Sequence, residues 1–309
     1  MTTAVVFAYH NVGVRCLKTL LAHRVEVPLL LTHDDDPQET IWFDRVAATA
    51  AEYGIATLTP ADPNTPEVVA RVASCRPDFI FSFYYRLMLK PALLALPARG
   101  ALNLHGSLLP KYRGRAPVNW AIIHGETETG ATLHYMTQRP DEGDIIGQTP
   151  VPILPDDTAR EVFDKVTVAA ELTLYSVLPA LIAGTAPRLP QDPSRASYFG
   201  GRKPEDGIID WSQNAARIHN LVRAVAPPYP GARTIISGRP ARILRSRVLD
   251  ADAATTSSAP VLSVENGRFV ARCGGGGALV VHELEVDGAG VSPAAFAERM
   301  GSRLVALGA

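Results

Sequence analysis

Cysteine is scarce in this chain, with three among 309 residues. Cys16, Cys75 and Cys273 lie far apart in the sequence and at no spacing typical of a metal site. An odd number of isolated cysteines fits a reducing compartment better than a disulfide-linked secreted protein. The eight histidines include no H-E-x-x-H pair, so the sequence implies no metal. We therefore expect a cytoplasmic protein without a metal cofactor.

The chain also lacks a charge excess and an obvious membrane segment. Its 30 Lys and Arg residues nearly balance 31 Asp and Glu residues, and the formal net charge of −1 gives no overall attraction to nucleic acid or to an anionic membrane. The N-terminal residues MTTAVVFAYH carry no basic leader and indicate a first strand, not a signal peptide. No apolar stretch approaches the roughly 20 residues that cross a bilayer. We expect neither a nucleic-acid partner nor a membrane association.

The first half of the sequence alternates strand-like and helix-like segments. Short apolar or β-branched runs predict strands over 4–10, 27–33, 78–85, 100–105 and 130–136. Apolar residues at three- and four-residue spacing predict helices over 14–24, 42–53 and 66–75. This alternation predicts an α/β fold with a mostly parallel sheet covered by helices.

The pattern changes after residue 203. A long helix over 158–183 precedes a linker-like stretch rich in Pro, Ser and Gly. One further helix over 215–225 is followed by short β-type runs separated by Gly, Ser and Asp, which predicts a small β-rich domain. Since 309 residues exceed the usual size of one domain, we expect two, over 1–203 and 204–309.

The stretch NLHGSLLPKYRGRAP, residues 103–117, is a poor helix and a poor strand, so it must be a loop. Asn103 and His105 are two positions apart at a strand end, so their side chains point to the same side. In parallel sheets the ligands bind at the carboxyl ends of the strands. We expect Asp141, in RPDEGD beyond the next strand, to return beside His105 in a βα-type connection, orient the imidazole and raise its pKa.

An amide donor, an imidazolium donor and a carboxylate suit a reaction that builds negative charge on an oxygen. Acyl transfer is such a reaction, and one donor to its oxyanion is typically worth roughly 3 to 4 kcal/mol. The competing interpretation is structural, because histidine, asparagine and aspartate end strands in many α/β proteins as buried, hydrogen-bonded side chains. The spacing alone leaves both interpretations open.

Other chemistries find little support. The turn AYHNVG lacks the G-x-G-x-x-G pattern of dinucleotide-binding folds, and Ser107 lacks the G-x-S-x-G context of a serine nucleophile. Lys111, Arg113 and Arg115 form a cationic group that either captures a carboxylate or phosphate or is simply solvated.

The longer segment NLHGSLLPKYRGRAPVNWAIIHGETETGATLHYM, followed by RPDEGDIIGQ, resembles the folate-dependent formyltransferases. Their shared pattern is Asn-x-His, then SLLP and RG-x-AP, then a TG strand and a D-x-G turn. FSFYYR, IDW and PYPGA extend the likeness nearly end to end. The resemblance implies a Rossmann-like catalytic domain with helices on both faces, a small OB-like C-terminal barrel, and 10-formyltetrahydrofolate as the formyl donor.

The resemblance also assigns roles to residues. Asn103 and His105 would polarise the formyl oxygen, and Asp141 would raise the pKa of His105. The implied folate contacts are Leu87, Met88, Leu89, Arg115, Thr137, Gln138, Arg139, Pro140 and Asp141. The candidate contacts to the acceptor are Tyr9, His10 and Arg202, which lie in segments peculiar to one type within the family.

That type is indicated by FAYHNVG, THDDDPQE and YFGGRKPEDG, which look most like the enzymes that formylate UDP-4-amino-4-deoxy-L-arabinose for lipid A modification and polymyxin resistance. A separate UDP-glucuronate decarboxylase is the protein partner that this type implies. The rivals are another nucleotide-sugar N-formyltransferase, a methionyl-tRNA formyltransferase, and a folate- or nucleotide-sugar-binding protein without turnover. Residues 204–309 hold 11 arginines, no lysine and 10 acidic residues, a balance of only +1 (11 − 10), which argues against tRNA.

Overall fold

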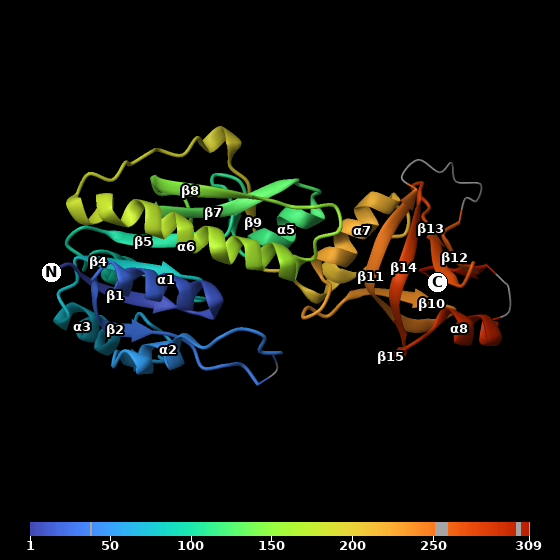
Figure 1. The fold of residues 1–309 in the computed structure, drawn as a ribbon, viewed down its shortest axis with the longest axis horizontal. Coiled ribbons are helices and arrows are strands. Elements are labelled where there is room, and N and C mark those ends of the chain that lie inside the picture. The colour runs from blue at the N-terminus through green and yellow to red at the C-terminus, as the bar shows by residue number, and fades with distance from the viewer. Residues whose placement is uncertain (38, 251–258, 301–303, 309) are drawn as a thin grey trace. The chain divides into compact units, whose positions relative to one another are not determined.

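The computed structural model describes residues 1–37, 39–250, 259–300 and 304–308 (Figure 1). The chain forms two compact units. The first consists of residues 1–117, 128–152 and 163–200. The second consists of residues 118–127, 153–162 and 201–309.

The first unit is built on a seven-stranded sheet in the order β3-β2-β1-β4-β5-β7-β8. Its strands are β1 (Thr3–Ala8), β2 (Glu26–Leu31), β3 (Ala56–Leu58), β4 (Phe79–Phe83), β5 (Ala101–His105), β7 (Glu128–Tyr135) and β8 (Ile145–Pro152), and the short strands β6 (Arg113–Gly114) and β9 (Tyr198–Phe199) pair apart from it. Its helices are α1 (His10–Ala22), α2 (Val46–Glu52), α3 (Pro66–Ser74), α4 (Pro91–Leu94), most of α6 (Ala159–Ala183) and the 3-10 turn η1 (Pro193–Arg195). β1 to β5 pair in parallel, whereas β7 and β8 are antiparallel.

Helices cover both faces of this sheet, which explains the continuous apolar runs of its central strands. Val5, Phe7 and Ile80 form a core with side chains of α3 and α4. On the other face Gly13 of α1 packs closely against Ala8, and α1 contacts α2 and lies beside α6 (Figure 1). The α/β class predicted from the sequence is therefore confirmed.

Helix α6 corrects one expectation. With 25 residues it is long and apolar enough, by length and composition, to cross a membrane. In the sequence Glu171 divides this segment into two shorter apolar runs. In the structure Glu171 pairs with Arg15 of α1 at 2.6 Å, and 44% of the 18-residue apolar window of α6 is buried.

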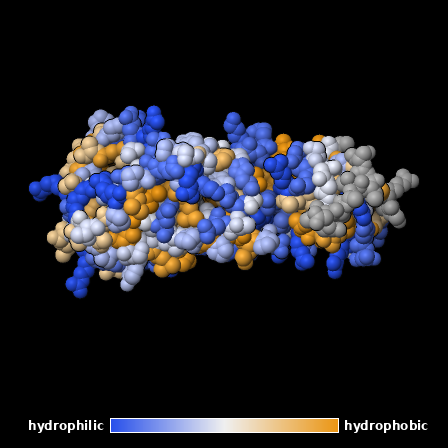
Figure 2. All heavy atoms as spheres, turned by 90° about the horizontal axis from the view of Figure 1, so that it is seen from above, coloured by the Kyte–Doolittle hydropathy of each residue, from blue (hydrophilic) through white to orange (hydrophobic). Residues whose placement is uncertain are grey.

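On the face shown in Figure 2, apolar side chains alternate with hydrophilic ones in small patches.

The second unit contains an antiparallel sheet in the order β10-β11-β14-β13-β12-β16. Its elements are α5 (Pro117–Ile123), η2 (Pro204–Gly207), α7 (Ala215–Ala224), β10 (Ala232–Ile236), β11 (Arg239–Asp250), β12 (Val261–Glu265), β13 (Arg268–Arg272), β14 (Ala278–Val286), β15 (Ala289–Gly290), α8 (Pro293–Met300) and β16 (Val305–Ala306). A bridge between Ile236 and Leu307 brings the two edges together, so the sheet is nearly a closed barrel. The predicted β-rich tail is confirmed.

Candidate active site

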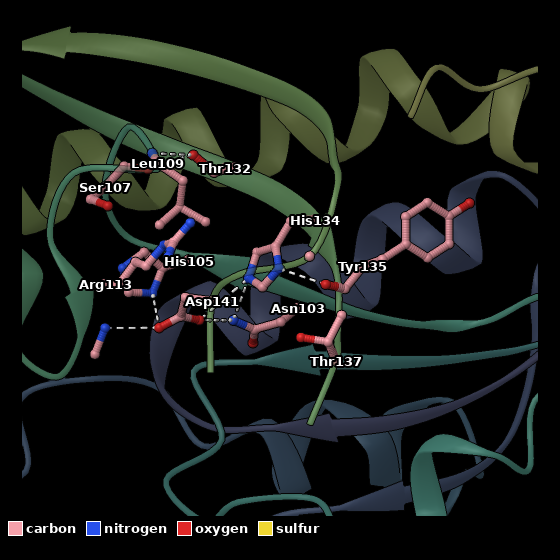
Figure 3. Close-up of polar contacts among 12 residues, drawn as sticks. Asn103, His105, Ser107, Leu109, Arg113, Thr132, His134, Tyr135, Thr137 and Asp141 are labelled. Carbon is pink, nitrogen blue, oxygen red and sulfur yellow. Dashed lines mark hydrogen bonds and ion pairs between the residues drawn. The ribbon is translucent and has the colours of Figure 1, made fainter. Parts of the chain in front are cut away.

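The polar cluster forms around the end of β5, a strand buried in the sheet (Figure 3). Asn103 and His105 lie on the same side of the strand, as period-two alternation requires. His105 is buried and Asn103 is half-buried. Both side chains point toward the carboxyl group of Asp141.

Asp141 reaches this position by a route different from the one expected. β7 runs antiparallel to β5, with Thr132 opposite His105 and Tyr135 opposite Leu102. The chain therefore leaves β7 past the beginning of β5 and doubles back before β8, so the connection is between two antiparallel strands and is not of the βα type. The left-handed backbone of Asp141, with φ 57°, is part of this return.

The Asp141 carboxylate has polar neighbours on both oxygens. Oδ2 accepts the Gly114 amide proton at 2.9 Å and lies 3.6 Å from His105 Nδ1. Oδ1 lies 3.4 Å from His134 Nε2 and 3.4 Å from Asn103 Nδ2. Burial by itself raises the pKa of this carboxyl, but His105, His134 and the Gly114 amide outweigh burial and hold the pKa well below its usual 3.8. Asp141 is therefore ionised throughout the neutral range.

This lowered pKa makes the stability of the protein depend on Asp141 in a defined pH window. A carboxyl whose pKa is lower in the folded state stabilises the fold above its unfolded pKa and loses that contribution as the pH falls. We expect Asp141→Asn to lower the free energy of unfolding at pH 7 by about 1.5 to 3 kcal/mol, the usual range for hydrogen bonds to a charged group. The difference from wild type should shrink as the pH falls below the ordinary value of 3.8. Urea unfolding across pH 2 to 7 measures it; a difference that stays constant with pH would contradict this account.

The second ring nitrogen of His105 is also engaged. His105 Nε2 lies 2.7 Å from the backbone carbonyl oxygen of Tyr112. Both nitrogens thus face oxygen acceptors, and only the imidazolium form donates to both. A substrate oxygen can therefore accept a hydrogen bond from Nε2 only if the Tyr112 carbonyl oxygen moves away from it.

The loop that carries Tyr112 and Gly114 is held by residues 191–199. β6 pairs with β9, and the amide of Tyr112 donates to Ser197 Oγ at 2.9 Å. Gln191 Nε2 donates to the carbonyl oxygens of Asp141 and Gly143 at 2.8 and 2.7 Å. The stretch that looks like a linker in the sequence therefore fixes both the loop after β5 and the turn at Asp141.

Gly114 is the position in this loop least able to accept a side chain. Its φ is +99°, and a Cβ there would lie 2.1 Å from the Phe199 carbonyl oxygen. We expect Gly114→Ala to lower the free energy of unfolding by more than about 1 kcal/mol and to move the amide away from Asp141, which reduces turnover. Gly200→Ala is the matched control, because a Cβ there meets nothing within 4 Å. Thermal unfolding and turnover of the two variants test this, and equal behaviour would contradict it.

Two residues of the cluster were missed in the sequence. His134 is 1% exposed, and its Nε2 lies 3.2 Å from Asn103 Nδ2 as well as near Asp141. Within TLHYM it looks like an ordinary core histidine, and only the opposition of Asn103 and His134 across β5 and β7 reveals it. No sequence pattern pointed to Gln191, because a single glutamine in a Pro-rich stretch looks the same whether its side chain is buried or solvated.

The residues expected to contact folate fall into two groups. In the loop after β4, Leu87 and Met88 are 39% and 55% exposed, whereas Leu89 is 6% exposed and belongs to the core next to α3 and α4. In the turn before Asp141, Thr137, Gln138 and Arg139 are exposed, and Pro140 is half-buried. Arg115 is exposed in the loop after β5. The structure thus offers apolar and polar side chains at the surface on two loops, with Leu89 behind them.

The three candidate acceptor contacts belong to different units, Tyr9 and His10 to the first and Arg202 to the second. Tyr9 is buried beneath Arg86, and its hydroxyl donates to Asp35 at 3.2 Å. His10 is 8% exposed. Three aromatic rings surround its imidazole, those of Trp42, Phe43 and Phe163. Arg202 belongs to the second unit, where one guanidinium nitrogen donates to the Asp206 carbonyl oxygen at 2.8 Å.

Burial decides the roles of two further candidates, the cationic group after β5 and Ser107. Lys111 and Arg115 are exposed, but Arg113 is buried and donates to Gln191 Oε1 at 2.8 Å, so the three cations do not converge on one ligand. Ser107 is fully buried and donates to the Lys111 carbonyl oxygen at 2.6 Å, which is a structural role. Within the described part of the chain, no three His, Cys, Asp or Glu side chains are grouped so that they could hold a metal ion.

The first unit thus places an imidazole, a carboxamide and a carboxylate together beside an α/β sheet, and the second unit is a small, nearly closed barrel. The comparison with protein families agrees with this arrangement. The "Formyl transferase" model matches residues 15–178, and the "Formyl transferase, C-terminal domain" model matches residues 202–300. The chain therefore belongs to the formyl transferase family.

Solved structures of sugar N-formyltransferases have the same fold. The N-formyltransferase from Helicobacter canadensis, in complex with folinic acid and dTDP-3-aminofucose, superposes with a TM-score of 0.72 at 20% identity, over 91% of this chain and 99% of that one. WlaRD, a sugar 3N-formyltransferase solved in the presence of dTDP and 5-N-formyl-THF, gives 0.71 at 21% identity over 91% and 97%. A sugar N-formyltransferase from a Shewanella species gives 0.60 at 19% identity over 75% and 92%.

Proposed function

We propose that this enzyme transfers the formyl group of 10-formyltetrahydrofolate to the 4-amino group of UDP-4-amino-4-deoxy-L-arabinose. The observation that carries the proposal is the convergence of Asn103 and His105 on an ionised Asp141, whose side chain is 11% exposed, in a chain of the formyl transferase family. The acceptor rests on the segments near Tyr9, His33 and Arg202, which look most like the formyltransferase half of the polymyxin-resistance protein ArnA. Structural neighbours solved with a formyl-folate analogue and a dTDP-aminosugar or dTDP support the same substrate classes.

The chemistry follows from the donors and the lack of a nucleophile among them. The neutral amine of the sugar attacks the formyl carbon, and the carbonyl electrons move to the oxygen. Asn103 Nδ2 and a His105 N–H donate to the oxyanion that forms. The bond from the formyl carbon to N10 of the folate then breaks, and the proton lost by the amine is returned to N10. No covalent enzyme intermediate forms, so atoms and charge balance between the two substrates alone.

Asp141 acts through His105 in this mechanism. Its carboxylate lies 3.6 Å from His105 Nδ1 and so orients the imidazole ring, whose other nitrogen, Nε2, faces the Tyr112 carbonyl oxygen. His134 and the Gly114 amide in turn hold Asp141, so the carboxylate stays in place as charge develops on the substrate. If His105 Nε2 donates to the formyl oxygen, it gives up its hydrogen bond to the Tyr112 carbonyl oxygen. The loop after β5, which carries Tyr112, then shifts locally.

The folate fits the two exposed loops of the first unit. Leu87 and Met88 offer apolar surface of the kind that packs on a pterin ring, and the turn from Thr137 to Pro140 offers backbone groups and polar side chains. Arg115 offers a cation to a carboxylate of the ligand. Leu89 supports this loop from within the core and does not itself reach the surface.

An acceptor assay tests the proposal directly. The protein is incubated with 10-formyltetrahydrofolate and, in separate reactions, UDP-4-amino-4-deoxy-L-arabinose, a dTDP-aminosugar and methionyl initiator tRNA, and the products are weighed by mass spectrometry. We expect one formyl group on the UDP-aminosugar and none on the tRNA. Transfer to the tRNA would establish the rival acceptor, and transfer to the dTDP-aminosugar alone would replace the sugar while keeping the reaction.

A further inference from the structure

The second unit contains a cavity of about 590 Å³ that none of Asn103, His105 and Asp141 lines. Its walls come from the first turn of α6, the end of α7, and the neighbouring strands β11 and β14. Pockets of a few hundred Å³ are the size that proteins use for small ligands. The size therefore suits a molecule no larger than a nucleotide.

Arginine dominates the lining of this cavity. Arg245 and Arg247 are two positions apart on β11, so both side chains leave the same face of the strand, and both are exposed. Neither guanidinium makes a hydrogen bond or an ion pair with any residue that the structure describes. Arg160 contributes a third cation from α6, and His282 of β14 lies across from them.

A fourth arginine forms the buried base of the cavity. Arg223 of α7 is 6% exposed and donates from Nη1 to the carbonyl oxygens of Leu154 and Asp157, at 3.2 and 3.0 Å. These acceptors are neutral, but the nearby carboxylates of Asp157 and Asp156 attract the guanidinium and offset part of its charge. Arg223 therefore adds a buried, partly compensated positive charge to the wall of the cavity.

Three carboxylates also line the cavity, and two of them are engaged elsewhere. Glu161 Oε2 accepts from the amide and hydroxyl of Thr158 at the start of α6, at 2.7 and 2.8 Å. Asp156 lies 3.3 Å from the buried imidazole of His219. Glu283 stands opposite Arg245 in the β11–β14 ladder and competes for it. Counting all charged lining residues, four arginines face three carboxylates, an excess of one positive charge (4 − 3), and Arg245 and Arg247 are the two guanidiniums without an ion pair among the described residues.

We infer that this cavity binds the phosphate group of a small phosphorylated ligand, at a site of its own in the C-terminal unit. Two planar guanidiniums on one strand face suit the oxygens of a phosphate or diphosphate, which accept several hydrogen bonds at once. The inference does not depend on the formyl acceptor proposed above, because it uses no residue of the Asp141 cluster.

Calorimetric titration of the full chain with inorganic pyrophosphate tests the inference. We expect Arg245→Gln/Arg247→Gln to weaken one binding transition by at least about tenfold. The control Arg239→Gln/Arg268→Gln removes the same charge from β11 and β13 outside the cavity and should leave that transition within about twofold. Circular dichroism confirms that both variants are folded. Equal losses in the two variants, or no loss in either, would overturn the inference.

Two further titrations identify the ligand. If UMP binds more tightly than pyrophosphate and depends on the same two arginines, the ligand is a nucleotide; equal binding indicates that the phosphate alone is recognised. A 20-nucleotide RNA that binds far more tightly than either and depends on these arginines would overturn the small-molecule assignment in favour of a polymer surface.

Discussion

Replacing His105 by alanine is expected to lower kcat for formyl transfer by about a hundred- to ten-thousandfold, the usual worth of a positioned imidazole. The substitution removes the ring that lies between Asp141 and the Tyr112 carbonyl oxygen. It leaves the exposed folate loop untouched, so KM for the folate should change little. Steady-state rates with the UDP-aminosugar acceptor measure the effect.

The control for this prediction is His23→Ala, which removes an imidazole of the same unit that contacts Tyr175 and not Asp141. It should retain nearly full turnover. Because His105 is buried, circular dichroism and thermal unfolding must show that the His105→Ala protein is folded. A folded His105→Ala protein with nearly wild-type turnover would remove the imidazole from the mechanism.

Asn103→Ala is expected to lower kcat by about a hundred- to a thousandfold, the usual loss when one donor to an oxyanion is removed. Asn103 Nδ2 lies 3.2 Å from His134 Nε2 and 3.4 Å from Asp141 Oδ1, and in the proposed mechanism one of its two protons turns to the oxyanion. The loss should fall on kcat and on kcat/KM alike, because the donor acts on charge that exists only in the transition state.

Asn220→Ala serves as the matched amide control, since Asn220 accepts from Arg223 in the second unit. It should leave kcat within about twofold, the range expected away from reacting groups. If Asn103→Ala raises KM and leaves kcat unchanged, Asn103 binds substrate in the ground state and the proposed oxyanion contact is wrong.

The sheet was predictable from the sequence because its central strands are short apolar runs between turn residues. The element boundaries were less so. α2 begins at Val46 and not at Trp42, because the rings of Trp42 and Phe43 pack around His10. α1 begins at His10, whose backbone has φ 67°, and not at Val14. Both differences arise from tertiary contacts of aromatic side chains, which periodicity does not encode.

The site was predictable where spacing along one strand decides it. Asn103 and His105 share a side of β5 by alternation alone. The direction of β7 was not predictable, because an apolar run reads the same in a parallel and in an antiparallel neighbour. For the same reason His134 was missed, since its meeting with Asn103 depends on how β5 and β7 are paired. Residues 191–199 fix the loop after β5 through contacts between segments far apart in the sequence, and no local sequence pattern predicts such contacts.

The most direct test of the central claim is a crystal structure of the protein with folinic acid, a stable formyl-folate, and UDP. The account predicts the formyl oxygen within hydrogen-bonding distance, about 2.6 to 3.2 Å, of Asn103 Nδ2 and a nitrogen of His105, with the Tyr112 carbonyl displaced where Nε2 is used. A formyl group bound elsewhere, with the Asn103, His105 and Asp141 side chains unchanged and out of its reach, would contradict the account.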